Sequence, residues 1–247
     1  RAARLHEEVV AAYDEYNFHH IYQKLHNFCA NDLGGFYLDV IKDRLYTTQA
    51  DSRARRSAQT AIYHIGEALV RWIAPILSYT ADEIWENLPG DRSQPVFTQL
   101  WYDALTRQDA DETMGAEYWQ HMMAVRDAVN KEMEAQRAAG AMRGSLDANV
   151  VLYCSGPLRE QLERLGDELR FVLITSSARL ENLEDAPADS AETELEGLRL
   201  SVAASADEKC ERCYHRRADV GASAEHPHLC GRCIVNVEGD GEPRQFA

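Results

Sequence analysis

Four cysteines near the C-terminus constrain this chain more than any other feature. They follow the pattern C-x2-C-x16-C-x2-C at Cys210, Cys213, Cys230 and Cys233. Two residues between two thiolates allow a tight turn that aims both sulfurs at one ion, and two such turns supply the four tetrahedral ligands, at about 2.3 Å, that zinc prefers. Because every ligand position is then filled, the spacing predicts one structural zinc ion rather than a catalytic one.

Other readings of this stretch stay open. His215, His226 and His228 lie between the two pairs, and one of them could replace a sulfur, although four cysteines at this spacing make that unnecessary. The cysteines could also form two disulfides or remain inert thiols. Six cysteines in 247 residues, four of them within twenty-four positions, favour a metal in a reducing compartment, which predicts a cytoplasmic protein. The isolated Cys29 and Cys154 are expected to be buried core thiols.

The first half of the chain has the periodicity of amphipathic helices. Apolar residues recur at three- and four-residue steps, for example at Leu5, Val9 and Ala12, and again from residue 62 to residue 76. About four such helices are expected, and their natural packing is an antiparallel bundle. The tryptophans expected in its core and in the following helix are Trp72, Trp85, Trp101 and Trp119.

The period changes further along the chain. A long helical pattern from Gly115 to Arg137 precedes two stretches typical of strands, "LDANVVLYC" at 146–154 and "LRLSVAAS" at 198–205, with a short helix expected at 157–165. The stretch 182–196 is acidic and poor in apolar residues, which indicates a loop. The fold class expected is therefore mainly α, with a helical bundle, a small α+β module and a four-cysteine zinc knuckle.

Three segments follow from these patterns. Residues 1–110 are expected to form the helical domain, residues 111–204 a helix plus the small α+β junction module, and residues 205–247 the zinc-binding knuckle, called the cysteine knuckle below. The first residues already have a helical pattern and no initiating Met, so the helical domain is expected to be truncated at its N-terminus.

Charge is unevenly distributed along the chain. The formal net charge of −15 argues against a broad nucleic-acid surface. Between Lys42 and Arg71, however, six basic residues face three acidic ones, whereas the stretch from Leu180 to Leu198 has seven acidic residues and no basic one. A polyanion is therefore expected to meet the first stretch. No run of eighteen apolar residues occurs, so no membrane-spanning segment is predicted.

Several stretches together resemble a known family. "YLDVIKDRLY", "ADSRARRSAQTAIYHIGEALVRWIAPILSYTADEIWENLPG" and the ending "EKCERCYHRRADVG…HLCGRCIVNVEGDGEPRQFA" closely resemble the C-terminal third of bacterial isoleucyl-tRNA synthetases, which are class I aminoacyl-tRNA synthetases. The resemblance runs over essentially the whole chain. The first part is similar to the helical anticodon-binding domain shared by the valine, leucine and isoleucine enzymes, and the zinc knuckle is a feature of the bacterial isoleucine type.

The resemblance implies a function and a set of partners. The parent protein would be an ATP-dependent isoleucine-tRNA ligase, and this piece would bind the anticodon stem-loop of isoleucine tRNA, next to the catalytic body of the same polypeptide and as a monomer. ATP and editing sites would lie upstream, so the piece alone is expected to be inactive. His64-Ile65-Gly66 matches part of the class I ATP-binding signature, but Glu67 follows within a helical pattern, which predicts an ordinary helical turn. No catalytic residue is expected in this chain.

Basic and aromatic side chains are the candidates for tRNA contact. Guanidinium groups pair with phosphates, and exposed rings stack on loop bases. The candidates are Lys42, Arg44, Arg53, Arg55, Arg56, Arg212, Tyr214, His215, Arg216, Arg217 and Arg232. The alternative for the first five is a solvated helix face with ion pairs to Asp39, Asp43 and Asp51, and the alternative for Tyr214 is packing on the metal site.

Two other functions remain to be weighed. The cysteine knuckle could brace the bundle or a protein partner as a scaffold and touch RNA little, a reading that the strong negative charge favours. A stand-alone zinc hydrolase is disfavoured because the ligand set is closed. The salt dependence of RNA binding distinguishes the scaffold from tRNA recognition, since phosphate contacts release counterions and therefore weaken as the salt concentration rises.

Overall fold

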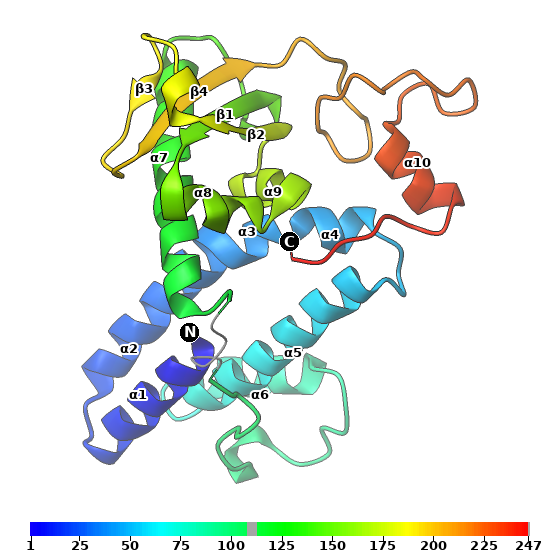
Figure 1. The fold of residues 1–247 in the computed structure, drawn as a ribbon. Coiled ribbons are helices and arrows are strands. Elements are labelled where there is room, and N and C mark those ends of the chain that lie inside the picture. The colour runs from blue at the N-terminus through cyan, green and yellow to red at the C-terminus, as the bar shows by residue number, and fades with distance from the viewer. Residues whose placement is uncertain (108–112, 247) are drawn as a thin grey trace. The chain divides into compact units, whose positions relative to one another are not determined.

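The computed structural model describes residues 1–107 and 113–246 and is mainly α-helical, with one small four-stranded sheet (Figure 1). The fold class expected from the sequence is confirmed. Packing divides the chain into two compact units: unit 1 comprises Arg1–Asp39 and Arg56–Ala116, and unit 2 comprises Val40–Arg55 and Glu117–Ala247. Both units are discontinuous in sequence, and the three-segment division at residues 110 and 204 stays a prediction.

Unit 1 is built from helices. They are α1 (Ala2–Asp14), α2 (Phe18–Asn27), the π-helix η1 (Phe28–Tyr37), the part of α5 (Arg53–Ile73) from Arg56 onward, α6 (Ser78–Asn87) and the short 3-10 helix η2 (Val96–Thr98). The short α3 (Leu38–Val40) lies where the chain passes from unit 1 to unit 2. The longer α-helices of this unit are α1, α2, α5 and α6.

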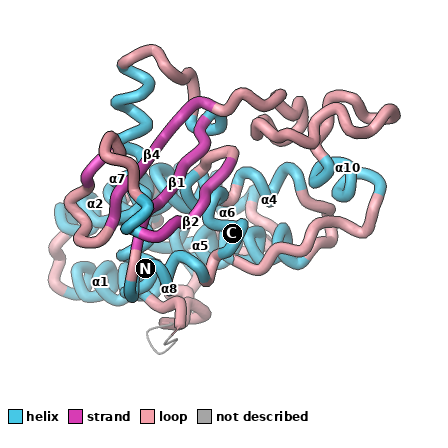
Figure 2. The backbone as a smooth tube through the Cα atoms, turned by 45° about the horizontal axis from the view of Figure 1, so that its top comes forward, coloured by secondary structure: helices cyan, strands magenta, loops and turns pink. Residues whose placement is uncertain are grey.

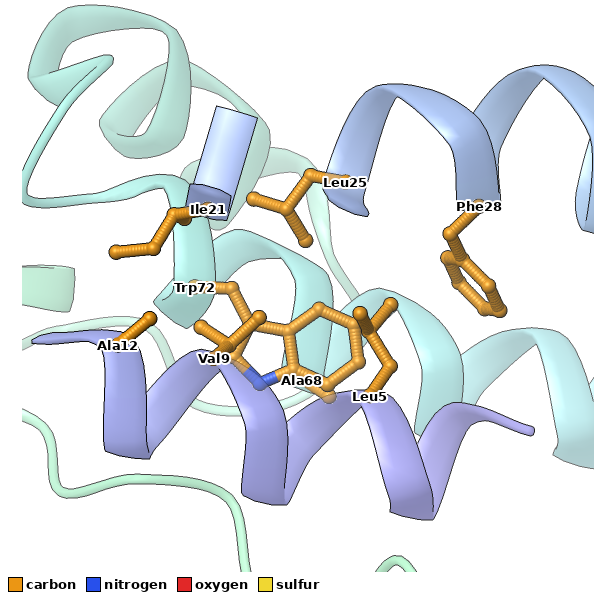
Figure 3. Packing of buried hydrophobic residues seen from close by; sticks show 8 residues of the cluster. All are labelled: Leu5, Val9, Ala12, Ile21, Leu25, Phe28, Ala68 and Trp72. Atoms are coloured by element: carbon orange, nitrogen blue, oxygen red, sulfur yellow. The ribbon is translucent and has the colours of Figure 1, made fainter. Parts of the chain in front are cut away.

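Apolar side chains from α1, α2, η1 and α5 form the main core of unit 1. Figure 3 shows its members, in which the indole of Trp72 lies between residues of α1 and α2: Leu5, Val9, Ala12, Ile21, Leu25, Phe28, Ala68 and Trp72. The indole nitrogen of Trp72 donates to Nδ1 of His6 at 2.9 Å, so the one polar atom of this buried ring is satisfied. A second cluster gathers Val70, Ala74, Ala81, Trp85 and Val96.

A buried carboxylate accompanies the second cluster. Glu67 is 2% exposed and pairs with Arg71 at 2.6 Å and with Arg92. Both guanidinium groups also lie over the ring of Trp85, at 4.7 and 4.1 Å from its centroid. Burial alone would raise the pKa of Glu67, but the hydrogen bonds from Arg92 and Arg71 hold it below its usual value. This charge is therefore fully paired inside the bundle.

Two expectations about buried residues need correction. Trp72 and Trp85 are core residues, as predicted, but Trp101 is 38% exposed and Trp119 is only half-buried. Cys154 is buried, whereas Cys29 is exposed. Cys29 lies in η1, a ten-residue π-helix, and the wider turn of a π-helix shifts side chains off the face that the 3.6-residue period assigns to them.

Unit 2 contains the sheet (Figure 2). Its elements in chain order are α4 (Lys42–Thr47), α7 (Ala116–Ala138), η3 (Ser145–Asp147), β1 (Ala148–Cys154), α8 (Gly156–Glu163), η4 (Gly166–Glu168), α9 (Leu169–Leu173), β2 (Ser177–Asn182), η5 (Leu183–Asp185), β3 (Ala191–Glu192), β4 (Leu198–Ala204) and α10 (Gly231–Glu238). The strand order is β2-β1-β4-β3. The central strand β1 runs parallel to β2 and antiparallel to β4, with Leu152 opposite Leu200.

The predicted long helix, both predicted strands and the short helix are present as α7, β1, β4 and α8. The edge strand β2 was not predicted. Its sequence "SARLEN" is half-buried or exposed at every position, so it lacks the alternation that marks a strand. Among the described residues, no helix combines the length and the apolarity that a bilayer crossing requires.

Candidate metal centre and nucleic-acid interface

The first cysteine pair lies in a tight hairpin. The backbone amide of Cys210 donates to the carbonyl of His215 at 2.9 Å, that of Tyr214 donates back to the carbonyl of Cys210 at 2.9 Å, and Lys209 bridges to Arg216. Tyr214 takes a left-handed conformation with φ of 64°. A positive φ is strained for a residue with a side chain, and the hydrogen bonds that close the turn offset this cost.

The second pair opens helix α10. Cys230 is the N-cap of that helix, and its backbone amide points at the sulfur of Cys210, 3.4 Å away. The next amide, of Gly231, donates to Oδ2 of Asp219 at 3.1 Å. A Cβ at position 231 would lie 3.0 Å from that oxygen, so a larger residue would push the Asp219 carboxylate away by a few tenths of an ångström.

The two turns bring the four sulfurs together. The sulfurs of Cys210, Cys213, Cys230 and Cys233 all lie within 4.8 Å of one another, and all four residues are buried. A zinc ion bonded tetrahedrally to sulfurs at about 2.3 Å requires sulfurs about 3.8 Å apart. The sulfurs of Cys213 and Cys230 are 3.8 Å apart. The donor set and its spacing therefore fit a zinc ion.

The three histidines stand outside this group. Nδ1 of His215 lies 3.2 Å from Nη1 of Arg170, and because arginine only donates, that nitrogen accepts and is unprotonated. Burial lowers the pKa of His215 to about 4. His226 pairs with Glu238, and His228 lies 3.9 Å from Glu211.

The thiols cannot all ionise without a cation. Hydrogen bonds from Cys230 and Cys233 lower the pKa of the Cys213 thiol, and the same contacts with Cys213 and Cys230 raise the pKa of Cys233. One thiolate is thus stabilised at the expense of its neighbours, because like charges this close repel one another. A divalent cation removes that repulsion, and coordinating thiols then lose their protons.

Apolar burial around the sulfurs is small. Among the described residues, the hydrophobic cluster here consists of the four cysteines, with the partly buried Val220 and Leu229 packed against it. Such a segment buries too little apolar surface to offset its conformational entropy without a cross-link. Its fold therefore depends on whatever holds the sulfurs together.

Arginines link the cysteine turns to α4 within unit 2. Arg212 donates to the carbonyl of Thr47 at 2.6 Å and approaches the sulfur of Cys233 at 3.9 Å. Arg232 is 6% exposed and makes a forked contact to both carboxylate oxygens of Asp43, at 2.7 and 2.8 Å. Burial alone would raise the pKa of Asp43, but the hydrogen bond and charge of Arg232 and the charge of Arg244 lower it to about 2. Asp43 is therefore ionised and shared by two arginines.

The C-terminal segment completes this ion cluster. Arg244 is 2% exposed, donates to Asp43 at 2.8 Å and lies 3.5 Å above the ring of Phe171. Glu242 accepts from Arg232 at 3.0 Å, and Glu168 accepts the backbone amides of residues 245 and 246 at 2.6 and 2.7 Å. No motif in the sequence indicated these residues, because their partners are far away along the chain.

The remaining candidates for RNA contact divide by exposure. Arg216 pairs with Asp147 at 2.6 Å, Arg217 lies 3.4 Å from Asp219, and His215 is buried. Tyr214 is 55% exposed, and the Lys209 ammonium lies 4.9 Å from the centre of its ring. The exposed cations of the basic stretch are Lys42, Arg53 and Arg56, whereas Arg44 and Arg55 are half-buried.

Comparison with known proteins gives these features a context. The model of the anticodon-binding domain of tRNA ligase matches residues 1–152, and the model of the zinc finger found in FPG and IleRS matches residues 207–235. The chain is 60% identical over 250 residues to isoleucine–tRNA ligase of Halorhodospira halophila (strain DSM 244 / SL1), and 57% identical over 247 residues to those of Pseudomonas aeruginosa (strain UCBPP-PA14) and Alcanivorax borkumensis.

In each comparison, all of the chain aligns with 26% of the relative, so the chain spans about a quarter of the length of the curated proteins it matches. The resemblance to bacterial isoleucine–tRNA ligases noted in the sequence is confirmed. The match over residues 1–152 covers more than half of the chain, and the zinc-finger match coincides with the four gathered sulfurs. The chain therefore belongs to the tRNA ligase family that carries this anticodon-binding domain.

Proposed function

We propose that this chain is the tRNA-recognising part of an ATP-dependent isoleucine–tRNA ligase and that it binds the anticodon stem-loop of isoleucine tRNA. The observation that carries the proposal is the presence, in one chain, of an anticodon-binding domain over residues 1–152 and the zinc finger of the isoleucine type over residues 207–235. Amino-acid activation with ATP and editing would belong to the rest of such a ligase, so the chain alone would bind tRNA without charging it.

In this proposal one zinc ion is held by Cys210, Cys213, Cys230 and Cys233. The four buried sulfurs provide a complete tetrahedral set, so the ion would stabilise the fold and would not activate water. Reduced cysteines of this kind require a reducing compartment, which supports the cytoplasm as the location. The likeness to the ligases supports a monomer joined to its catalytic body.

The RNA contacts would come from exposed side chains. Lys42, Arg53 and Arg56 are exposed cations, and the more than half-exposed ring of Tyr214 can stack on a splayed base. Arg44, Arg55 and Arg217 are half-buried and would contribute less to RNA binding than the exposed cations. Because the chain has a net charge of −15, the RNA contacts must come from a few side chains that fit the RNA locally and not from a broad basic face.

A second candidate function is that of a structural brace with little RNA contact. The observation that favours it is the use of Arg212, Arg216 and Arg232 in contacts within unit 2, which leaves the cysteine knuckle few free cations. In that case the knuckle would serve the ligase by holding its C-terminal region together.

The test is a titration of the zinc-loaded chain with isoleucine tRNA and a non-cognate tRNA at two salt concentrations, with Tyr214→Ala alongside. Selective binding that weakens with salt is expected, because phosphate contacts release counterions. The variant should lose about 1–3 kcal/mol of binding free energy, the usual worth of one stacked base. Equal, feeble binding to both tRNAs would overturn the proposal and favour the brace.

A further inference from the structure

The two cysteine turns carry a matching pair of arginines. Each pair has arginine in the position before its second cysteine, Arg212 in "CERC" and Arg232 in "CGRC". Both side chains extend to α4: Arg212 donates to the carbonyl of Thr47 at 2.6 Å, and Arg232 forks onto the carboxylate of Asp43 at 2.7 and 2.8 Å. Each half of the metal site is therefore attached to the same short helix.

The two attachment points lie one helical turn apart. Asp43 and Thr47 are four residues apart in α4, which places them on the same face. They are also joined to each other, since the hydroxyl of Thr47 donates to the carbonyl of Asp43 at 2.7 Å. Arg244 also donates to Asp43 at 2.8 Å, and the C-terminal segment passes beside α4 (Figure 1). The cysteine knuckle thus contacts α4 at the Asp43 side chain and at the backbone carbonyl of its last residue, Thr47.

A helix of this size depends on such contacts. α4 has six residues and follows α3 after the single residue Ile41, and helices in proteins gain most of their stability from tertiary contacts. The cysteine turns, for their part, hold their shape through the sulfurs, because they bury little apolar surface. Loss of the metal would therefore release Arg212 and Arg232 together and leave α4 without its two anchors on the knuckle.

We propose that Asp43, Arg212 and Arg232 are positioning residues, which transmit the geometry of the metal site to α4 and so set the orientation of its basic residues Lys42 and Arg44. The proposal rests on the proposed function for its consequence, which is that zinc supports tRNA binding through α4. Arg212 and Arg232 then act by holding α4 and not by touching phosphate.

Charge gives the proposal a sharp test. Asp43 is an acidic residue inside a basic stretch, so its removal would strengthen binding of a polyanion if only charge mattered. If Asp43 positions α4, its removal has the opposite effect. Asp43→Asn is then expected to weaken binding of isoleucine tRNA by about fivefold or more, which lies within the usual range of coupling between two sites. Asp51→Asn removes the same charge from an exposed turn of the same stretch, and this matched control is expected to bind unchanged or slightly tighter.

A double-mutant cycle separates positioning from direct contact. If Asp43 and Arg232 act as one pair, Arg232→Gln also weakens tRNA binding. The double variant then has the same affinity for tRNA as the single variant that binds less tightly. If Arg232 touches phosphate, Arg232→Gln weakens binding, Asp43→Asn strengthens it, and the effects add, which overturns the proposal. Zinc content is measured for every variant, and Asp43→Glu, which keeps the charge, is expected to recover part of the affinity.

Hydrogen exchange tests the link to α4 without RNA. The zinc-loaded chain is compared with the chelated chain by mass spectrometry. Peptides covering Lys42–Thr47 are expected to exchange at least about fivefold faster after chelation, whereas peptides covering α6 in unit 1 are expected to be unchanged. Unchanged exchange in α4, with faster exchange only in the cysteine turns, would overturn the proposal. If the wild-type chain shows no preference for isoleucine tRNA, the proposed function fails, and hydrogen exchange alone decides the positioning role.

Discussion

The helical bundle of unit 1 and the cysteine knuckle of unit 2 are stabilised in different ways. In the bundle, Leu5, Ile21 and Trp72 are fully buried, and they belong to one continuous apolar cluster. In the knuckle the buried cluster is the four cysteines, with two partly buried aliphatic side chains beside them. Apolar burial stabilises the first region in proportion to area, whereas the proposed metal–sulfur bonds would supply the free energy in the second.

The two regions also use buried carboxylates differently. Glu67 in the bundle pairs with arginines of its own unit beside Trp85, within a core that apolar packing already holds. Asp43 joins α4, the second cysteine turn and the C-terminal segment through its contacts with Arg232 and Arg244. An ion pair adds to an apolar core in the one case and joins segments that are distant in the sequence in the other. This contrast predicts which changes affect which region.

The largest effect is expected from metal removal. Chelation of the zinc-loaded chain should unfold residues 205–240, because the ion supplies folding free energy of order 10 kcal/mol in small zinc modules. The bundle should keep its structure, since its core contains no ligand. Two-dimensional NMR checks this: knuckle amides should collapse to random-coil positions while bundle amides stay dispersed. Persistent dispersion of the knuckle would contradict the contrast.

The next effect concerns the core of the bundle. Trp72→Ala should destabilise unit 1 by about 3–5 kcal/mol, the cost of a large cavity in a packed core. Zinc content should stay at one ion per chain. Thermal unfolding and metal analysis measure the two quantities. Trp101→Ala is the matched control: the residue is 38% exposed, so a smaller loss than for Trp72→Ala is expected.

A smaller loss is expected when the buried charge of the bundle is removed. Glu67→Gln leaves Arg71 and Arg92 without a counter-charge, at 12% and 11% side-chain exposure. Breaking a buried pair costs about 3–5 kcal/mol, and partial access of water to the arginines places this case near 3. Urea unfolding gives the value. Glu163→Gln, which breaks the exposed pair with Arg159, should cost less than about 1 kcal/mol, and an equal loss in both variants would remove the distinction between buried and exposed pairs.

The smallest effect is the pH dependence of Asp43. Its pKa in the folded chain is lowered to about 2, so its contribution to stability is complete above the unfolded value near 4 and is lost as the pH falls towards 2. The stability difference between wild type and Asp43→Asn should be roughly 2 kcal/mol at neutral pH and should vanish near pH 2. Zinc content is measured at every pH, because release of the metal would also separate Arg232 from Asp43 in the wild-type chain. Denaturant titrations at several pH values measure the difference, which a pH-independent gap would contradict.

Local patterns were enough for much of this molecule. The spacing of the four cysteines predicted that their sulfurs would meet, and the apolar periods predicted α1, α5, α7, β1 and β4. These features depend on residues close together in the sequence, where spacing translates directly into geometry. Cys29 was misplaced because η1 departs from the α-helical period, and β2 was missed because a polar edge strand lacks alternation.

The sequence by itself determined the four-cysteine cluster, the helical class and the kinship with the tRNA ligases, because each depends on short-range spacing or on extended sequence identity. Only the tertiary structure decided what the basic residues do. Arg232 looks like a free cation in the sequence, yet its guanidinium is paired with Asp43, 189 positions away along the chain. Charge type is a local property, but the partner of a charge is set by packing between distant segments, and burial then decides whether that charge meets solvent or another residue.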